Sequence, residues 1–72
     1  SHKPMLYETL SVQENLVFFA QMYGRGSTER VRELLSIVGL WLHRYEPVTI
    51  LSRGMQQRLA LARTLIAEPK LI

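Results

Sequence analysis

Three short amphipathic stretches, each preceded by serine and bounded by glycine or proline, constrain the fold of this chain more than any other feature. In the first, Ser11 and Glu14 form a capping box, which predicts a helix that begins at Val12. Gly24 is placed to end this helix. At about 100° per residue, its core-facing stripe consists of Val12, Leu16, Phe19 and Tyr23.

The second stretch predicts a helix that starts near Ser27 or Thr28 and stops at Gly39. Its polar face carries Glu29, Arg30, Arg32 and Glu33. Its apolar residues recur at helical spacing and should face the core, and they are Val31, Leu34, Leu35 and Val38.

Residues 40–50 are less regular, because Pro47 forbids a continuous helix through this region. We expect a short turn followed by an extended segment. Trp41 and Leu42 are available for the core. Trp41 and His43 are expected to be packing or surface residues rather than ligands, since no second metal-ligand candidate lies at a useful spacing.

The third stretch predicts a helix capped by Ser52 that runs to about Ala67. It should stop before Pro69, because the residue before proline is biased out of the helical region. Residues 70–72 then look like the first step into a strand. The predicted fold is therefore mainly α, with three principal helices and one short irregular segment.

The chain has 72 residues, of which 47% are hydrophobic and 21% charged, as in a globular protein. A domain of this size buries only about 60% of its unfolded surface, so we expect marginal stability. No run approaches the roughly 18 apolar residues of a membrane span, and no cysteine is present. Phe18 and Met22 widen the apolar arc of the first helix and indicate either additional core, which we favour, or a docking surface. Together with residues 71–72, this apolar excess predicts that the isolated segment assembles as a dimer or a swapped form.

The net charge of +3, from nine Lys and Arg against six acids, raises the question of a nucleic-acid partner. The arginines are spread over three segments without a continuous basic run, so a mixed solvated surface is favoured. All six acids are Glu, and no Asp is present. Chemistry that depends on aspartate is therefore excluded within this segment.

Leu51–Arg58 is the stretch that carries chemistry. A serine N-cap followed by glycine at the second helical position leaves backbone N–H groups free at the positive end of a helix, which is a ready anion site. Ser52, Gly54, Arg53 and Gln56 are candidates for contacts with a phosphate. The alternative is an ordinary capped helix, which the local pattern alone favours.

This stretch resembles the signature motif of ABC ATPases, LSGGQ followed by Gln-Arg, and residues 59–72 resemble the helix and turn that lead to the family's Walker B strand. Upstream, residues 7–16 look like the family's "LT-V-x-E-N-L" segment, and residues 38–40 look like its "VGL" turn. Four such matches in order and spacing cover nearly the whole chain. Arg53 and Met55 are similar to residues of export-type subunits, including haem and drug exporters.

The resemblance implies that residues 1–72 are a fragment of an ABC ATPase domain, a P-loop α/β protein. By this comparison, residues 1–10 correspond to the end of the Q-loop and residues 11–50 to the helical subdomain. Residues 51–68 correspond to the signature motif with its following helix, and residues 70–72 to the start of the Walker B strand.

The resemblance also implies a function: ATP hydrolysis coupled to transport, with ATP and Mg²⁺ as cofactors of the parent protein. The signature motif would contact the γ-phosphate of ATP bound to an opposing subunit in a head-to-tail dimer, through Ser52, Arg53, Gly54, Met55 and Gln56. The partners would be a second nucleotide-binding subunit and transmembrane subunits, with no nucleic acid. The protein would lie at the cytoplasmic face of the cell membrane.

Some positions depart from the family pattern. Arg53 replaces the first glycine of LSGGQ and Met55 its glutamine. His2 stands where the Q-loop glutamine is expected, as a native variant or as the remnant of an expression tag. In the family, the region of Met5, Leu6 and Tyr7 faces the coupling helix of the membrane subunit.

Residues for catalysis are missing from the segment: it has no GxxxxGKS/T motif and no acidic pair after an apolar strand. We expect the 72 residues alone neither to hydrolyse ATP nor to bind nucleotide tightly, and no metal site is predicted. Arg58 falls in the apolar arc of the last helix, so a structural ion pair or carbonyl partner is expected for it. The alternative function is a small basic helical interaction or DNA-binding module, for which only Gln56, Gln57 and Arg63 would be left to read bases.

Overall fold

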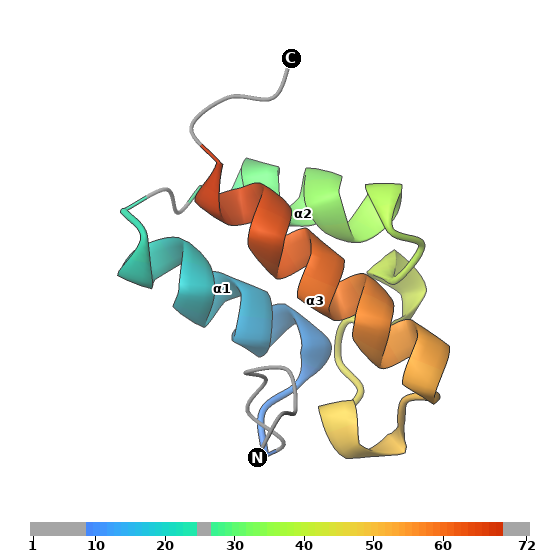
Figure 1. The fold of residues 1–72 in the computed structure, drawn as a ribbon. Coiled ribbons are helices and arrows are strands. Elements are labelled where there is room, and N and C mark those ends of the chain that lie inside the picture. Colours follow the sequence, from blue (N-terminus) through green and yellow to red (C-terminus); the bar gives the residue numbers. More distant parts are fainter. Residues whose placement is uncertain (1–8, 25–26, 69–72) are drawn as a thin grey trace.

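The computed structural model describes residues 9–24 and 27–68. Within these ranges the chain forms three α-helices, α1 (Val12–Met22), α2 (Thr28–Ile37) and α3 (Arg53–Ala67), and two 3₁₀ turns, η1 (Trp41–His43) and η2 (Val48–Ile50). In Figure 1, α3 lies between α1 and α2, and each helix contacts the other two. The prediction of a mainly helical fold with three principal helices is confirmed.

The start of α1 is held by the predicted capping box. The Glu14 amide donates to Ser11 Oγ at 3.1 Å, and the Ser11 amide donates to Glu14 Oε1 at 2.9 Å. At the other end of the helix, Gly24 has a φ of +69°, a conformation that glycine adopts without strain. The helix therefore has the predicted start, and it ends two residues before the predicted glycine.

The exposed side of α1 differs from the prediction. Phe18 is 39% exposed and Met22 is 55% exposed, so the favoured assignment of these two residues to the core is wrong. Tyr23, predicted in the core stripe, is 37% exposed, and its ring stacks on Phe19 instead of entering the core. Only one side of a helix meets its neighbours, and α2 and α3 cover the arc of Val12, Leu16 and Phe19.

Helix α2 begins with Ser27, whose Oγ accepts from the Arg30 amide at 3.0 Å. It ends in a Schellman motif: the Leu40 amide donates to the Leu35 carbonyl at 2.8 Å, and the Gly39 amide donates to the Ser36 carbonyl at 3.1 Å. Gly39 has a φ of +77°, which this motif requires. The side chains of Leu35 and Leu40 are both buried beneath it.

Residues 40–51 cross from α2 to α3 through the two 3₁₀ turns. Pro47 is extended and pairs with Ser11 as an isolated bridge, but Val48–Ile50 forms η2 where an extended segment was predicted. Leu42 is 87% exposed, so its assignment to the core is also wrong, while Trp41 is partly buried against the core. In a 3₁₀ turn, successive side chains point in different directions, so Trp41 faces the core while Leu42 faces outward.

The core lies where the three helices meet, and among residues 9–24 and 27–68 it contains one polar residue. Leu59, Ala62 and Ile66 of α3 are buried in it, together with Val48 and Leu51 of the crossing segment. Asn15 is fully buried, and its Nδ2 donates to the Ser11 carbonyl at 3.0 Å and to the Leu10 carbonyl at 3.4 Å. None of the helices in the described part of the chain is both long and apolar enough to cross a membrane.

Candidate functional site

The candidate site is the N-terminal end of α3, in residues 51–58, the stretch that resembles the signature motif of ABC ATPases. Ser52 is extended, with a ψ of 165°, and its Oγ accepts from the Met55 amide at 3.1 Å. Its carbonyl accepts from the Gln56 amide at 2.9 Å. Both oxygens of Ser52 thus accept hydrogen bonds from the first turn of α3, while its hydroxyl hydrogen remains available for donation. The cap and an outward donation are compatible because a hydroxyl both accepts and donates.

Two backbone amides at this end of α3 have no acceptor in the chain. Neither Arg53 nor Gly54 donates a backbone hydrogen bond to any described residue. The first amides of a helix carry the positive end of its dipole, and α3 is 15 residues long. This end of the helix therefore offers two N–H donors and a positive potential to an anion.

Gly54 has no structural requirement within the described fold. A Cβ added there would have no atom within 4 Å, and the φ of Gly54 is not positive. Glycine nevertheless costs about 1 kcal/mol relative to alanine inside a helix. The glycine leaves open space directly over the free amides, so a group from outside can approach the backbone closely.

The other residues predicted at the site take different positions. Arg53 is exposed and lies at the start of the helix beside the free amides. Met55 packs against the core, and its amide is already used by Ser52. Gln56 is partly buried, and its Nε2 donates to the Val48 carbonyl at 3.0 Å. The structure thus brings Ser52, Arg53 and Gly54 together at the surface and turns the side chain of Met55 inward.

The sequence pattern places Arg58 in the apolar arc of the last helix, but in the structure the residue lies outside the apolar interface. The residue is exposed, and no ion pair or side-chain hydrogen bond joins it to another described residue. Its guanidinium lies near Gly39, where a Cβ would be 3.7 Å from Nη1. No described residue is therefore the ion-pair or carbonyl partner that was predicted, and the exposed position makes such a partner unnecessary.

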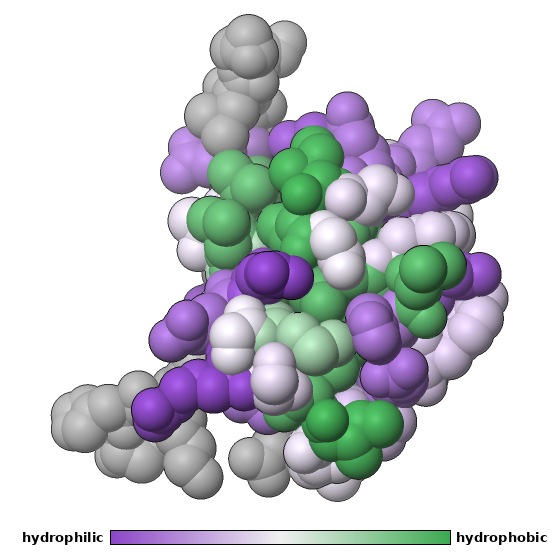
Figure 2. Space-filling view, turned by 90° about the vertical axis from the view of Figure 1, so that its right-hand side faces the viewer, coloured by the Kyte–Doolittle hydropathy of each residue, from purple (hydrophilic) through white to green (hydrophobic). Residues whose placement is uncertain are grey.

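The surface around this end of α3 is mixed in polarity. Figure 2 views the side of the molecule on which α3 begins, and it shows hydrophobic groups beside hydrophilic ones rather than a continuous hydrophilic face. Ile50, two residues before Ser52, is 64% exposed. This mixed surface is unlike the uniformly positive surface that binds a phosphate backbone.

The whole chain, residues 1–72, matches the sequence model of the family described as ABC transporter. The chain belongs to the ABC transporter family. The match begins at the first residue and ends at the last, so it includes residues 51–58 and all three helices. It gives no support to the alternative of a small DNA-binding module.

Individual ABC transporter proteins resemble this chain over nearly its whole length. An uncharacterized ABC transporter ATP-binding protein of Haemophilus influenzae is 44% identical over 73 residues, which cover 97% of this chain and 30% of that protein. A fluoroquinolones export ATP-binding protein of Mycobacterium tuberculosis is 44% identical over 69 residues, covering 96% and 23%. A taurine import ATP-binding protein of Pelagibacter ubique is 46% identical over 70 residues, covering 93% and 26%. The chain spans between 23% and 30% of these relatives, which include an exporter and an importer.

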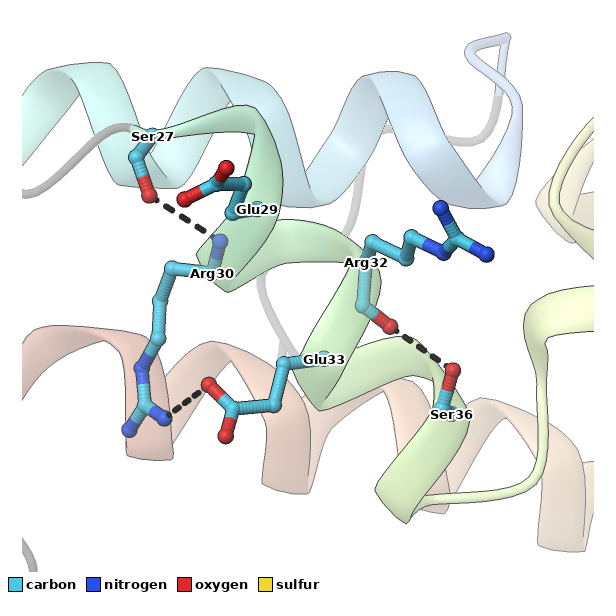
Figure 3. Close-up of a pocket in the computed structure, with 6 residues that line it drawn as sticks. All are labelled: Ser27, Glu29, Arg30, Arg32, Glu33 and Ser36. Carbon is cyan, nitrogen blue, oxygen red and sulfur yellow. Dashed lines mark hydrogen bonds and ion pairs between the residues drawn. The ribbon is translucent and has the colours of Figure 1, made fainter.

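A second surface of this ABC transporter chain is the polar face of α2. Figure 3 shows that its side chains come from one helix and its preceding serine, and that Arg32 points away from the Arg30–Glu33 pair. The distance from Arg30 Nη1 to Glu33 Oε1 is 2.9 Å. This polar face of α2 is a solvated helix surface, as its charge pattern predicts.

No described residues form a cluster of three or more potential metal ligands. The Nδ1 atom of His43 lies 3.0 Å from Oε1 of Glu46.

Two further sets of predicted residues lie outside the described ranges. These are His2, at the position of the Q-loop glutamine, and the expected coupling-helix contacts Met5, Leu6 and Tyr7. Residues 70–72, the predicted start of a strand, also lie outside them. Sequence reasoning did not identify the pairing of Gln56 with Val48, because nothing in the spacing of the two residues indicates it.

Proposed function

We propose that this chain is the helical subdomain of an ATP-hydrolysing ABC subunit, and that its signature motif binds the γ-phosphate of ATP held by an opposing subunit. Ser52 would donate its hydroxyl, and Arg53 and Gly54 would donate their amides. Met55 and Gln56 would support these donors from behind rather than contact the nucleotide. The domain boundaries inferred from the resemblance, with the signature motif at residues 51–58, are part of this proposal.

The observation that carries the proposal is the open space over the free amides at Gly54. Like other serine-capped helix starts, α3 leaves its first two amides without an acceptor. What distinguishes it is Gly54, because a Cβ built there would have no atom within 4 Å, so the approach to these amides is open. A terminal phosphate oxygen is an acceptor of the size and charge that such a helix end binds. The arrangement supports a contact made in trans, because no described residue fills the space.

The arginine at position 53 adds a charge to this site. Its side chain is exposed and has no ion-pair partner among the described residues, so it is available for a phosphate oxygen. A charge-assisted contact of this kind is stronger than a neutral one. The charge of Arg53 would thereby offset the steric hindrance that its side chain introduces at the position of the motif's first glycine.

The rest of the catalytic machinery would come from other parts of the parent protein. Binding of Mg²⁺ and ATP requires a phosphate-binding loop and acidic residues that these 72 residues lack, so the segment alone is expected to be inactive. The partners would be a second nucleotide-binding subunit and transmembrane subunits at the cytoplasmic face of the membrane, with no nucleic acid. An export direction, which the resemblance at Arg53 and Met55 suggests, also belongs to this proposal.

The test uses the full-length protein that contains this segment. We expect Ser52→Arg to abolish dimerisation driven by a non-hydrolysable ATP analogue, because a bulky cation replaces a donor at the phosphate. Binding of the same analogue to the monomer should change less than twofold, since the nucleotide is held there by the P-loop. Sedimentation velocity with and without the analogue measures the first quantity, and equilibrium titration measures the second. Unchanged dimerisation would remove the signature motif from this role.

A further inference from the structure

The carbonyl oxygen of Val48 accepts two hydrogen bonds. The Leu51 amide donates to it at 3.1 Å, which closes the turn η2, and Gln56 Nε2 donates to it at 3.0 Å. The second donor comes from α3, eight residues further along the chain. The turn that precedes the signature motif is therefore tied to the helix that follows it.

Gln56 donates hydrogen bonds to two residues that precede Arg53, one through its backbone amide and one through its side chain. Its backbone amide donates to the Ser52 carbonyl at 2.9 Å, and its side chain reaches the Val48 carbonyl. Residues 48–52 thus form a short loop whose two ends are bonded to the same residue. Because Ser52 lies inside this loop, the direction of its hydroxyl and of the following amides depends on how firmly the loop is held.

The opposite side of the loop is anchored to α1 and the core. The Val48 amide donates to the Leu10 carbonyl at 3.2 Å, and the Val12 amide donates to the Glu46 carbonyl at 2.9 Å. The side chain of Val48 is 1% exposed and that of Leu51 is 7% exposed. Val48 is therefore held on this side by its buried side chain and by the hydrogen bond of its amide. The hydrogen bond from Gln56 Nε2 links the Val48 carbonyl to α3.

We propose that Gln56 is a positioning residue of the signature motif, which holds Ser52 and the amides of Arg53 and Gly54 in the direction needed to meet a phosphate of the opposing subunit. This inference rests on the proposed function. It differs from the contact predicted for Gln56 from the sequence, because the amide nitrogen of its side chain points to Val48 and away from the open end of α3. Preorganised donors matter because a donor that is misdirected loses most of its interaction with the phosphate.

Gln21, on α1 and outside residues 51–58, offers a matched control. It is the same residue type in a helix, it is exposed, and no side-chain hydrogen bond joins it to a described residue. Replacement of either glutamine by methionine keeps length and helix propensity but removes the donor. Only Gln56→Met should therefore affect the loop.

The experiment compares Gln56→Met, Gln56→Lys and Gln21→Met in the full-length protein. We expect Gln56→Met to weaken analogue-driven dimerisation about tenfold, since each dimer contains two copies of a hydrogen bond worth a factor of about three. Gln56→Lys retains a donor of similar reach and should restore most of the affinity. Gln21→Met should equal the wild type. Analogue binding to each monomer should stay within twofold, and circular dichroism should show equal helix content.

The outcomes separate this inference from the proposed function on which it depends. If Ser52→Arg blocks dimerisation but Gln56→Met does not weaken it, the positioning role is wrong and the proposed function stands. Equal losses for Gln56→Met and Gln21→Met, or no recovery with Gln56→Lys, would likewise overturn the positioning role. A merely structural role predicts a lower melting temperature and unchanged dimerisation of the folded protein. If Ser52→Arg itself has no effect, the proposed function fails first.

Discussion

The guanidinium carbon of Arg63 lies 4.7 Å from the centroid of the Phe19 ring, so a cation on α3 packs against an aromatic residue of α1. Arg63 Nη2 also donates to the Tyr23 hydroxyl at 3.5 Å, and its Nε is buried without a hydrogen-bond partner in the structure. The side chain of Arg63 therefore covers part of the interface between the two helices. Its aliphatic stem and its charge both contribute to that contact.

Arg63→Ala is expected to lower the free energy of unfolding by about 1–2 kcal/mol, because it removes both the cation–π contact and the packing of the stem. Urea denaturation monitored by circular dichroism measures this change. Gln57→Ala, on the exposed side of the same helix, should stay within about 0.5 kcal/mol of the wild type. Equal effects of the two variants would show that the contact with Phe19 does not stabilise the fold.

The two glycines at positions 39 and 54 should respond to alanine in opposite directions. Gly39→Ala forces a Cβ into the left-handed region and should lower the free energy of unfolding by about 1–2 kcal/mol. Gly54→Ala meets no atom within 4 Å, and it should raise stability by up to about 0.5–1 kcal/mol. Thermal unfolding of both variants tests this difference in sign.

Gly54→Ala should at the same time weaken ATP-driven dimerisation, because the new methyl group occupies the space over the free amides. The relevant measurement is sedimentation of the full-length variant with a non-hydrolysable ATP analogue. Gly24→Ala serves as a control remote from the site: Gly24 likewise has open space around it, and its positive φ makes this substitution the strained one of the two. A stabilised Gly54→Ala protein that dimerises normally would contradict the proposed close approach.

Replacements of Ser52 separate its capping role from its proposed role at the phosphate. Asp is as good an N-cap as Ser, so Ser52→Asp should keep the free energy of unfolding within about 0.5 kcal/mol of the wild type, whereas Ser52→Ala should lose about 1 kcal/mol. In the dimerisation assay the order reverses: Ser52→Asp places a negative charge at the phosphate and should abolish closure, while Ser52→Ala should only weaken it. If closure follows stability instead, Ser52 acts as a cap alone.

Asn15 is the polar residue of the core, and its Nδ2 bonds to two backbone carbonyls at the start of α1. Asn15→Leu removes this donor from buried acceptors and should lower the free energy of unfolding by about 2 kcal/mol. Gln21→Leu, on the exposed side of α1, is the matched control and should change stability by less than about 0.5 kcal/mol. Chemical denaturation of the pair distinguishes a required hydrogen bond from a simple preference for an apolar core.

Helix starts and stops could be read from the sequence because their causes are local. Ser11, Ser27 and Ser52 each accept from the amide three residues later, and Gly39 closes α2 in the predicted place. Hydrogen bonds over three residues depend only on the nearby backbone. The candidate site was predictable for the same reason, since a serine cap followed by glycine describes a helix end with free amides.

Burial was less predictable, because it depends on which side of each helix meets a neighbour. Phe18, Met22 and Leu42 are as apolar as the core residues, yet they lie on sides that no described helix covers. Conversely, Asn15 is polar but buried, since its side-chain amide donates to two backbone carbonyls at the start of α1. Periodicity identifies an apolar arc but cannot say where its edges will fall.

The sequence by itself therefore determined the number of helices, their caps, the glycine that ends α2 and the family to which the chain is similar. Only the tertiary structure decided that Arg58 is exposed, that Met55 packs inward and that Gln56 reaches the Val48 carbonyl. The physical reason is that caps are set within one helical turn, whereas the position of the turn η2 against α3 follows from the packing of all three helices around one core.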